Sequence, residues 1–392
     1  MAYHALTLTS PIAARIEAGR RDVTSSEVAG AERCEMGQPV RLLAPDGEQL
    51  AIGLADPENA LVRVMAVTRE GHAALDARFV RARVSRAIAL RRAFGLRRER
   101  TTHRLINGAG DGLPGLSVDL YGDYAVLYAY SRGLSNLARS VAEIVREELG
   151  LTGVVIKLRT RESAQGPVKQ EISGGEPPES LIVHEEGVPF EVHLLSGLNV
   201  GLFTDMREHR ANLGRITADK TVLNTFSYTG SLSVAAARCG ARCVTSVDLA
   251  SGVQNWAEAN FRLSGLDASA HRFETKEVSA FLDKAARAGE TFDVIIVDPP
   301  TYSAARAGAW SMRKDYPEMI VRVTRVLSEG GLLWLSANSR ELGPLPELAL
   351  GAFGRAKRTG QLLSVGGLPP DYPTLPAQPE DRYLQMSLFC VH

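Results

Sequence analysis

The sequence predicts an α/β protein in which a mostly parallel sheet follows a small all-β domain and a small α+β domain. The main observation is an alternation of strand-like apolar runs and helical segments from about residue 221 onward, which is typical of a parallel sheet covered on both faces. A second observation is the length of 392 residues, which suffices for two or three domains. We place these domains at residues 1–72, 73–190 and 191–392.

The composition is that of a globular protein with a large core. Lys plus Arg and Asp plus Glu both number 45, and 45% of the residues are hydrophobic, which excludes disordered, collagen-like and coiled-coil chains. No stretch has the roughly 20 apolar residues that span a bilayer, and the N-terminus lacks the apolar run of a signal peptide. We therefore expect a cytoplasmic protein without a membrane partner.

The cysteines are too few and too scattered for a disulfide framework or a metal site. We expect them to be reduced and mostly buried, and we expect no bound metal. They are Cys34, Cys239, Cys243 and Cys390.

Residues 1–72 are predicted to form short strands. The apolar runs 40–44 and 49–55 flank the turn Pro45-Asp46-Gly47, which predicts a hairpin. The alternating run 61–67 predicts a third strand after a second turn at 56–59.

An arginine-rich segment lies near the start of the second domain. Ten arginines and one acid, Glu99, lie between Arg78 and Arg104, in a chain whose net charge is zero. The spacing of the apolar residues predicts a helix with arginines around a narrow apolar stripe. The segment is either a solvated linker helix or a surface for RNA phosphates, and the sequence alone favours neither. The candidate RNA contacts in it are Arg81, Arg91, Arg97 and Arg98.

Residues 103–190 are predicted to form an α+β unit. A loop rich in turn residues at 108–115 precedes strands at 117–119 and 124–129, and an amphipathic helix follows at 136–149. The Gly- and Pro-rich residues 166–180 predict an exposed loop.

The third domain supplies the parallel sheet. Its predicted strands, each followed by a helix, are 221–227, 243–249, 272–277, 292–298 and 331–336. A last strand is expected at 383–391, after a Pro-rich loop at 369–379.

Ligands of such sheets bind at the carboxyl ends of the strands, so the residues that follow each strand are candidates. After the first strand, a loop of hydroxyl residues ends in Gly230 at a helix N-terminus, where backbone N–H groups can reach a carboxylate. Asp248 stands where an acid binds ribose hydroxyls, and Glu277 can accept from an adenine amine. The alternatives are a plain connection, a helix N-cap and an ordinary loop acid. The candidate residues of these three loops are Asn224, Phe226, Ser227, Tyr228, Thr229, Gly230, Asp248, Leu249, Glu277 and Val278.

The fourth strand runs into Asp298-Pro299-Pro300-Thr301-Tyr302. Two prolines after a buried strand end it and fix the backbone, so that Asp298 and the neighbouring carbonyls are held rigidly. Tyr302 adds an aromatic ring that can stack on a planar base. This loop therefore predicts a site for methylating nucleobases, and the alternative is a simple strand terminator. The candidate catalytic residues are Asp298, Pro299, Pro300 and Tyr302, with Asp298 also a cofactor candidate.

Taken in order, the four loops resemble those of a class I S-adenosylmethionine-dependent methyltransferase. The upstream segment 201–210 resembles one that precedes the sheet in bacterial large-subunit (23S) ribosomal RNA methyltransferases, and the resemblance extends through 104–122 and 165–168. It implies a Rossmann-like domain with a seven-stranded sheet, S-adenosylmethionine as cofactor and RNA as partner. Residues 1–72 loosely resemble a PUA-type RNA-binding domain. The residues of the upstream segment that the resemblance assigns to the cofactor are Phe203, Asp205, Arg207 and Arg210.

The family has a 5-methylcytosine branch and a 7-methylguanine branch. The cytosine branch attacks the ring with a cysteine thiolate after the fifth strand, where this chain has Ala337 in the stretch 336–340. A guanine nitrogen has a lone pair and needs only positioning. Asp298–Ser303 and Ser336–Arg340 resemble the guanine branch, and Arg340 is a further candidate RNA contact. Glu277, where the family usually has Asp, and the last fifty residues depart from the pattern.

We therefore expect methyl transfer from S-adenosylmethionine directly to a guanine nitrogen of ribosomal RNA. A 5-methylcytosine enzyme and a non-catalytic RNA-binding protein that retains the cofactor fold are the alternatives. A homodimer is left open.

Overall fold

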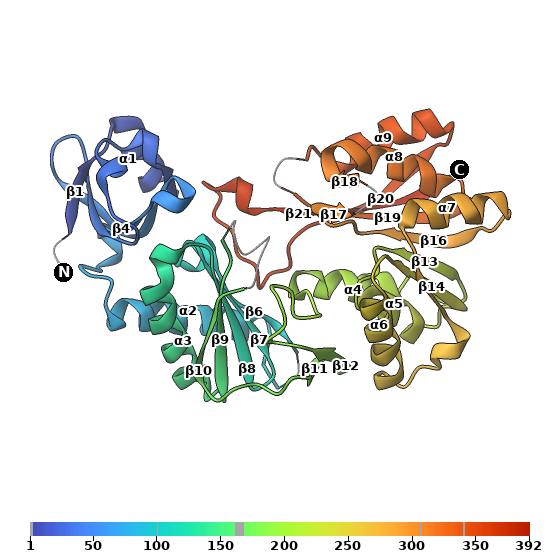
Figure 1. Ribbon diagram of the computed structural model, residues 1–392. Helices are drawn as coiled ribbons and strands as arrows, with labels where there is room; N and C mark the ends of the chain where they lie inside the picture. Colours follow the sequence, from blue (N-terminus) through green and yellow to red (C-terminus); the bar gives the residue numbers. More distant parts are fainter. Residues whose placement is uncertain (1–2, 100, 161–167, 306–307, 340–341) are drawn as a thin grey trace. The chain divides into compact units, whose positions relative to one another are not determined.

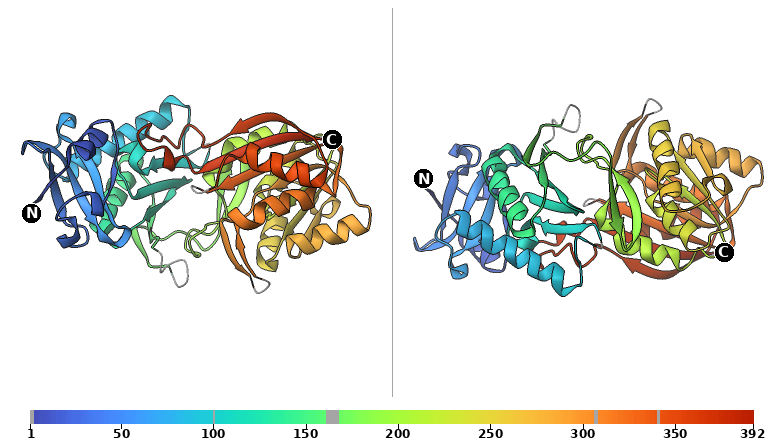
Figure 2. Two further views of the ribbon diagram at one scale, coloured as in Figure 1. Left: turned by 90° about the horizontal axis from the view of Figure 1, so that it is seen from above. Right: turned by 90° about the horizontal axis from the view of Figure 1, so that it is seen from below.

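The computed structural model describes residues 3–99, 101–160, 168–305, 308–339 and 342–392 (Figure 1). The chain forms two compact units. The N-terminal unit contains residues 1–187, 192–200 and 370–381, and the C-terminal unit contains 188–191, 201–369 and 382–392. The return of 370–381 to the N-terminal unit was not predicted, and its red trace can be followed in Figure 2. Predicted features at 165–167 and at Arg340 lie outside the described residues.

A five-stranded sheet of order β1-β3-β4-β5-β2 begins the N-terminal unit. The predicted hairpin and third strand are confirmed as β3, β4 and β5, whereas β1, β2 and α1 were not predicted. The core of this part includes Leu6, Ile16 and Val40. The elements are β1 (His4–Thr7), α1 (Ser10–Glu17), β2 (Asp22–Thr24), β3 (Pro39–Leu43), β4 (Gln49–Asp56) and β5 (Leu61–Val67).

The predicted arginine-rich helix is α2, which begins after Asp76. The Asp76 carboxylate accepts from the Phe79 N–H at 3.0 Å and so satisfies one of the free donors at the helix N-terminus. Phe79, Val84 and Ile88 face a core shared with α3 and a second five-stranded sheet, of order β10-β9-β8-β7-β6. The elements are α2 (Ala77–Ala93), β6 (His103–Asn107), β7 (Leu116–Tyr121), β8 (Tyr124–Ala129), α3 (Ser135–Leu149), β9 (Gly153–Leu158) and β10 (Gln170–Gly174).

The C-terminal unit contains a seven-stranded sheet of order β15-β14-β13-β16-β19-β21-β20. The pairs among β13, β14, β15, β16 and β19 are parallel, and β21 is antiparallel to both neighbours. The predicted alternation of strand and helix is therefore confirmed for this unit. Its strands are β13 (Thr221–Thr225), β14 (Cys243–Asp248), β15 (Arg272–Thr275), β16 (Phe292–Val297), β19 (Leu327–Asn338), β20 (Gly360–Gly366) and β21 (Leu384–Val391).

Helices cover both faces of this sheet (Figure 1). Leu333, Leu335 and Ala337 of β19 face a core formed with α7, α8 and α9, while the Trp334 ring points the other way, toward His209 of α4. The helices are α4 (Arg207–Gly214), α5 (Ser231–Arg238), α6 (Ser251–Leu263), α7 (Val278–Arg287), α8 (Met312–Thr324) and α9 (Leu345–Ala356).

The short strands β11 (Leu181–Glu185) and β12 (Val188–Val192) lie where the chain passes between the units, and β17 (Tyr302–Ala305) pairs with β18 (Gly308–Ser311). Among the described residues, no helix is long and apolar enough to cross a membrane.

Candidate active site

The strand order reverses between β13 and β16, and the loop after β13 lies at this point of the sheet. Its residues Phe226, Tyr228 and Gly230 have φ angles of 56°, 47° and 74°. A positive φ is unfavourable for the two aromatic residues, and such strain concentrates at functional sites. At Gly230 the positive φ favours glycine. Glycine is also needed for space, because a Cβ there would lie 2.8 Å from the Ala257 Cβ. The backbone of this loop is therefore held in a shape that ordinary connections do not adopt.

Asp248, at the end of β14, holds the same loop. Its Oδ2 accepts from the Tyr228 N–H at 3.0 Å, and its Oδ1 accepts from the Ala250 N–H at 3.3 Å. The N-cap residue of α6 is Ala250 and not Asp248, so the N-cap alternative is wrong. Each carboxylate oxygen can accept a further hydrogen bond, which fits the expected contact to two hydroxyls.

Glu277 is the N-cap of α7. Its two oxygens accept from the N–H groups of Ser279 at 2.9 Å and Ala280 at 2.8 Å, and β15 ends two residues earlier than predicted, at Thr275. Leu249 is 55% exposed, whereas Val278 is 3% exposed and belongs to the core. Leu249 thus offers an apolar surface at the strand ends, whereas the buried side chain of Val278 leaves its backbone for the predicted cofactor contact.

The prediction that the Asn224 side chain contacts the cofactor is corrected, because this side chain supports the loop instead. Its fully buried side chain donates from Nδ2 to the Ser233 Oγ at 2.9 Å, and Ser233 is hydrogen-bonded to Ser246 at 2.7 Å. A buried polar network of this kind joins β13, α5 and β14 below the loop.

The upstream segment is connected to the loop by several contacts. The Thr229 Oγ1 donates to the Gly201 carbonyl at 2.5 Å, and the Phe203 and Tyr228 ring centroids are 5.5 Å apart. The Arg210 guanidinium donates to the Phe203 carbonyl at 2.7 Å and to the Ser231 Oγ at 3.4 Å, at the start of α5.

Two further residues of this segment are buried. Asp205 accepts from the Tyr383 hydroxyl at 3.0 Å, and Arg207 begins α4. Of the predicted cofactor residues in this segment, Phe203 and Arg210 are thus brought beside the Ser227–Gly230 loop and the start of α5.

Asp298 follows β16 and lies beside the end of β19. The parallel register pairs Val297 with Leu335, so the next residues, Asp298 and Ser336, are neighbours, and the Ser336 hydroxyl donates to the Asp298 Oδ1. Burial raises the pKa of Asp298 to about 6, and the hydrogen bond from Ser336 opposes this increase. The carboxyl group therefore changes charge just below neutral pH.

The loop around Asp298 is fixed from two sides. The Tyr316 hydroxyl lies 3.2 Å from the Val297 carbonyl and 2.7 Å from the Ser336 carbonyl, and the Thr301 Oγ1 donates to the Asn338 carbonyl at 2.6 Å. Pro299 is buried and Pro300 is exposed. Tyr302 begins β17, and the position of its side chain lies outside what the structure describes.

Sequence reasoning missed the support that Ser336, Tyr316 and Tyr383 give to these acids. Ser336 lies in a stretch that the sequence singled out, but its contact with Asp298 depends on the register of two strands. Nothing in the sequence indicates the contacts of Tyr316 or Tyr383.

The cysteines of the C-terminal unit lie away from this edge. Cys243 begins β14 and pairs with Thr221, the first residue of β13, at the opposite end of the strands from Asp248. Cys390 pairs with Leu332, and Ala337 lies five positions further along β19, about 17 Å along an extended strand. The expectation that most cysteines are buried is wrong, because only Cys34 is buried.

The arginines of the N-terminal unit have different environments. Arg91 is 1% exposed and donates to both oxygens of Asp111, at 2.7 and 2.8 Å, so its predicted role as an RNA contact is corrected to a structural one. Arg81 forms ion pairs with Glu147 and Glu148, and Arg98 forms them with Glu99 and Asp123. Arg97 is exposed and has no ion pair among the described residues.

Comparison with known proteins agrees with this geometry. Residues 126–379 match the family model described as S-adenosylmethionine-dependent methyltransferase. YwbD of Bacillus subtilis, which carries the name of a ribosomal RNA large subunit methyltransferase, is 30% identical over 98% of both chains. Ribosomal RNA large subunit methyltransferase I of Klebsiella pneumoniae strain 342 is 31% identical over 90% of this chain and 89% of that protein.

Two solved methyltransferase structures are also similar to this chain over almost its whole length. The protein SMU.776, described as a methyltransferase and solved with S-adenosylhomocysteine, has a TM-score of 0.88 and 26% identity, and the match covers 99% of this chain and 100% of that one. A methyltransferase structure from Streptococcus mutans has a TM-score of 0.86 with the same identity and coverage.

Proposed function

Because the chain belongs to the S-adenosylmethionine-dependent methyltransferase family, we propose that it methylates a guanine nitrogen of large-subunit ribosomal RNA by direct transfer. The observation that carries this proposal is that residue 337 is an alanine and not a cysteine. Ala337 fills the place where the resemblance puts the thiolate of the cytosine branch. Cys243 and Cys390 lie at other parts of the sheet, and Cys239 follows the last residue of α5. Without a thiolate, carbon 5 of cytosine is not activated, whereas a guanine nitrogen already has a nucleophilic lone pair.

The cofactor supplies an electrophilic methyl group on a sulfonium. In our proposal, the positive-φ loop Ser227–Gly230 leads into α5 so that the first N–H groups of this helix, from Ser231 on, meet the carboxylate of the cofactor, and Asp248 accepts from its ribose hydroxyls. Leu249 lies against its adenine, which Glu277 and the backbone at Val278 contact at the edge. Phe203, Asp205, Arg207 and Arg210 close the site from the upstream segment.

Asp298 orients the guanine. When ionised, its carboxylate can accept from the ring N–H and the exocyclic amine of guanine, and the adjacent Pro299 holds the backbone still. Methylation of a ring nitrogen that carries no hydrogen leaves a positive charge on the base, and a fixed carboxylate stabilises that charge as it develops. Ser336 keeps the carboxylate in position, and Tyr302 stacks on the base in this proposal.

The test is nucleoside mass spectrometry of ribosomal RNA from strains with and without the gene. We expect a methylguanosine to disappear in the deletion, to return with the wild-type gene, and to stay absent with Asp298→Ala. Loss of 5-methylcytosine instead would refute the guanine assignment. A second assay uses RNA that contains 5-fluorocytosine, in which the fluorine blocks release of a covalent intermediate. We expect no covalent adduct, and an adduct would contradict direct transfer.

The N-terminal unit supports RNA binding in this proposal. Its first sheet serves as a PUA-like module, and exposed arginines of α2 and the following segment contact phosphates. Arg78, Arg86, Arg92 and Arg97 are exposed and form no ion pair among the described residues. A non-catalytic RNA-binding protein would bind the same RNA without any nucleoside changing in the deletion strain.

A further inference from the structure

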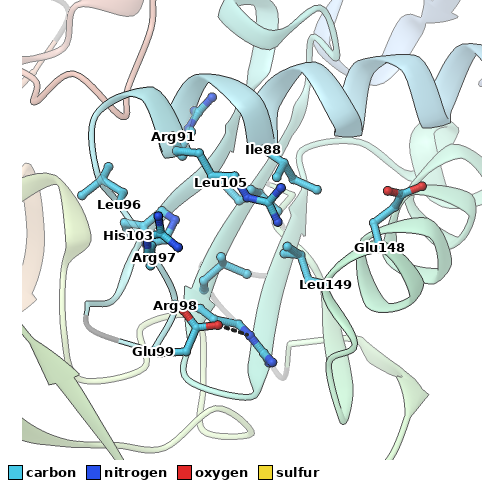
Figure 3. A pocket seen from close by; sticks show the side chains of 12 residues that line it. Ile88, Arg91, Leu96, Arg97, Arg98, Glu99, His103, Leu105, Glu148 and Leu149 are labelled. Atoms are coloured by element: carbon cyan, nitrogen blue, oxygen red, sulfur yellow. Dashed lines mark hydrogen bonds and ion pairs between the residues drawn. The ribbon is translucent and has the colours of Figure 1, made fainter.

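We infer that the N-terminal unit holds one unpaired nucleotide of the RNA in a pocket at the C-terminal end of α2. This inference rests on the proposed function for its ligand class, but the pocket is built entirely from the N-terminal unit. It has a volume of about 410 Å³, within the range of small-molecule sites. Its walls come from α2, the segment after it, β6, β7 and the end of α3 (Figure 3).

One part of the pocket lining is apolar, and Arg91 and His103 lie beside it. Ile88 of α2, Leu105 of β6, Leu120 of β7 and Leu149 of α3 line it, and they come from four different elements around one hollow. A hollow of this size with apolar side chains on one part of its wall fits the flat face of a nucleobase that has left its stack, since unpaired bases are the part of RNA that proteins bind in pockets.

The rim of the pocket is cationic. Arg92, Arg97 and Arg98 line it, together with the carboxylates of Glu99 and Glu148. Both carboxylates are occupied, because Glu99 lies 3.3 Å from Arg98 and Glu148 lies 2.6 Å from Arg81. Arg92 and Arg97 have no such partner among the described residues, so two positive charges remain at the rim to bind a phosphate.

Two neighbouring features favour RNA over a free nucleotide. Arg78 lies on the same exposed face of α2 as Arg92, about 21 Å away along the helix. A longer RNA strand that binds at Arg92 can therefore place further phosphates near Arg78. Phe94, directly after α2, is 55% exposed. Exposing a phenyl ring to water is unfavourable, and the exposed ring can stack on a second base.

The experiment measures binding of a fluorescein-labelled single-stranded RNA dodecamer to the full-length protein at several salt concentrations. We expect the double variant R92Q/R97Q to bind at least tenfold more weakly and to lower the slope of log K against log salt by about 1.4, since each phosphate contact on a single strand contributes about 0.7. Leu149→Phe, which fills the pocket, should weaken binding several-fold without changing the slope. The matched control R33Q/R139Q changes the same charge in the same unit outside the pocket and should bind like the wild type.

The position of the bound RNA on the protein is tested by photocrosslinking the same dodecamer with a 4-thiouridine incorporated. We expect the crosslink in residues 88–105, and Leu149→Phe should remove it. Equal loss of affinity in the control, a crosslink elsewhere, or equal affinity for double-stranded RNA would overturn the inference. Binding of adenosine monophosphate as tightly as the dodecamer would make the pocket a free-nucleotide site instead.

The two proposals fail separately. Absence of any methylated guanine refutes the reaction but leaves the crosslink unaffected, whereas an unaltered slope refutes the pocket but leaves methylation intact. S-adenosylmethionine affinity should be the same in R92Q/R97Q and wild type, because the cofactor residues belong to the other unit.

Discussion

Replacing Asp298 with Asn should stabilise the C-terminal unit at neutral pH while it lowers methyl transfer. The folded-state pKa of Asp298 is about 6 against a usual value of 3.8. At about 1.4 kcal/mol per pKa unit, holding this group ionised costs the folded state about 3 kcal/mol at pH 7. Because Asp298 keeps partial exposure and the new amide needs its own partners, we expect a gain of about 1–3 kcal/mol in the free energy of unfolding.

The effect depends on pH with a definite sign. A raised carboxyl pKa means that the folded state binds the proton more tightly than the unfolded chain does. The wild-type protein therefore loses stability as pH rises from about 4 to about 6, and the Asn variant lacks this loss. The difference between the two proteins should be absent near pH 4 and complete by pH 7.

The assay is urea unfolding followed by tryptophan fluorescence at pH 4.5 and pH 7.5. All three tryptophans, at positions 256, 310 and 334, belong to the C-terminal unit, so the signal reports on that unit. Turnover should drop at least tenfold in the variant, and wild-type turnover should rise with pH through about 6 as Asp298 ionises. A variant that is no more stable at pH 7.5, or equally stabilised at both pH values, would refute the reasoning.

Substitutions at Asp248, at Gly230 and at the four cysteines test the cofactor loop and the direct-transfer mechanism. Asp248→Ala should weaken S-adenosylmethionine binding by about 1–3 kcal/mol in calorimetry, with Asp248→Asn less affected, and unchanged affinity would exclude Asp248 from the site. Gly230→Ala should lower the free energy of unfolding by about 1–3 kcal/mol, because φ is 74° and the new Cβ would contact Ala257; an unchanged urea midpoint would contradict this. Replacing Cys34, Cys239, Cys243 and Cys390 one at a time with Ser should preserve methyl transfer, and its loss in one stable variant would restore the thiolate mechanism.

The parallel sheet could be predicted because its strands are buried on both faces and read as continuous apolar runs. Strand ends were less certain, because side-chain contacts decide them. β15 ends at Thr275 since Glu277 caps the next helix, and β19 begins at Leu327 despite the polar residues that follow it. β20 was missed because its side chains are mostly exposed at the sheet edge and show no alternation.

The candidate site could be predicted from the sequence for those residues that are placed simply by following the end of a strand. The Ser227–Gly230 loop and Asp248 follow consecutive strands, and the structure connects them directly. The contact of Ser336 with Asp298 joins residues 38 positions apart and depends on strand register. Arg91 shows the same limit, because a charge in a basic run gives no sign of the buried Asp111 that pairs with it.

The return of residues 370–381 to the N-terminal unit bears on how this protein is made and inherited. The carbonyl of Asp371 accepts from Arg91 at 2.7 Å, its carboxylate accepts from the Arg104 N–H at 2.9 Å, and the Gln378 side chain accepts from the Arg21 N–H at 3.1 Å. During synthesis, the first unit therefore cannot complete these polar contacts until residues 370–381 have been translated. Neither unit corresponds to a continuous stretch of the gene, so a single recombination event cannot exchange one unit intact.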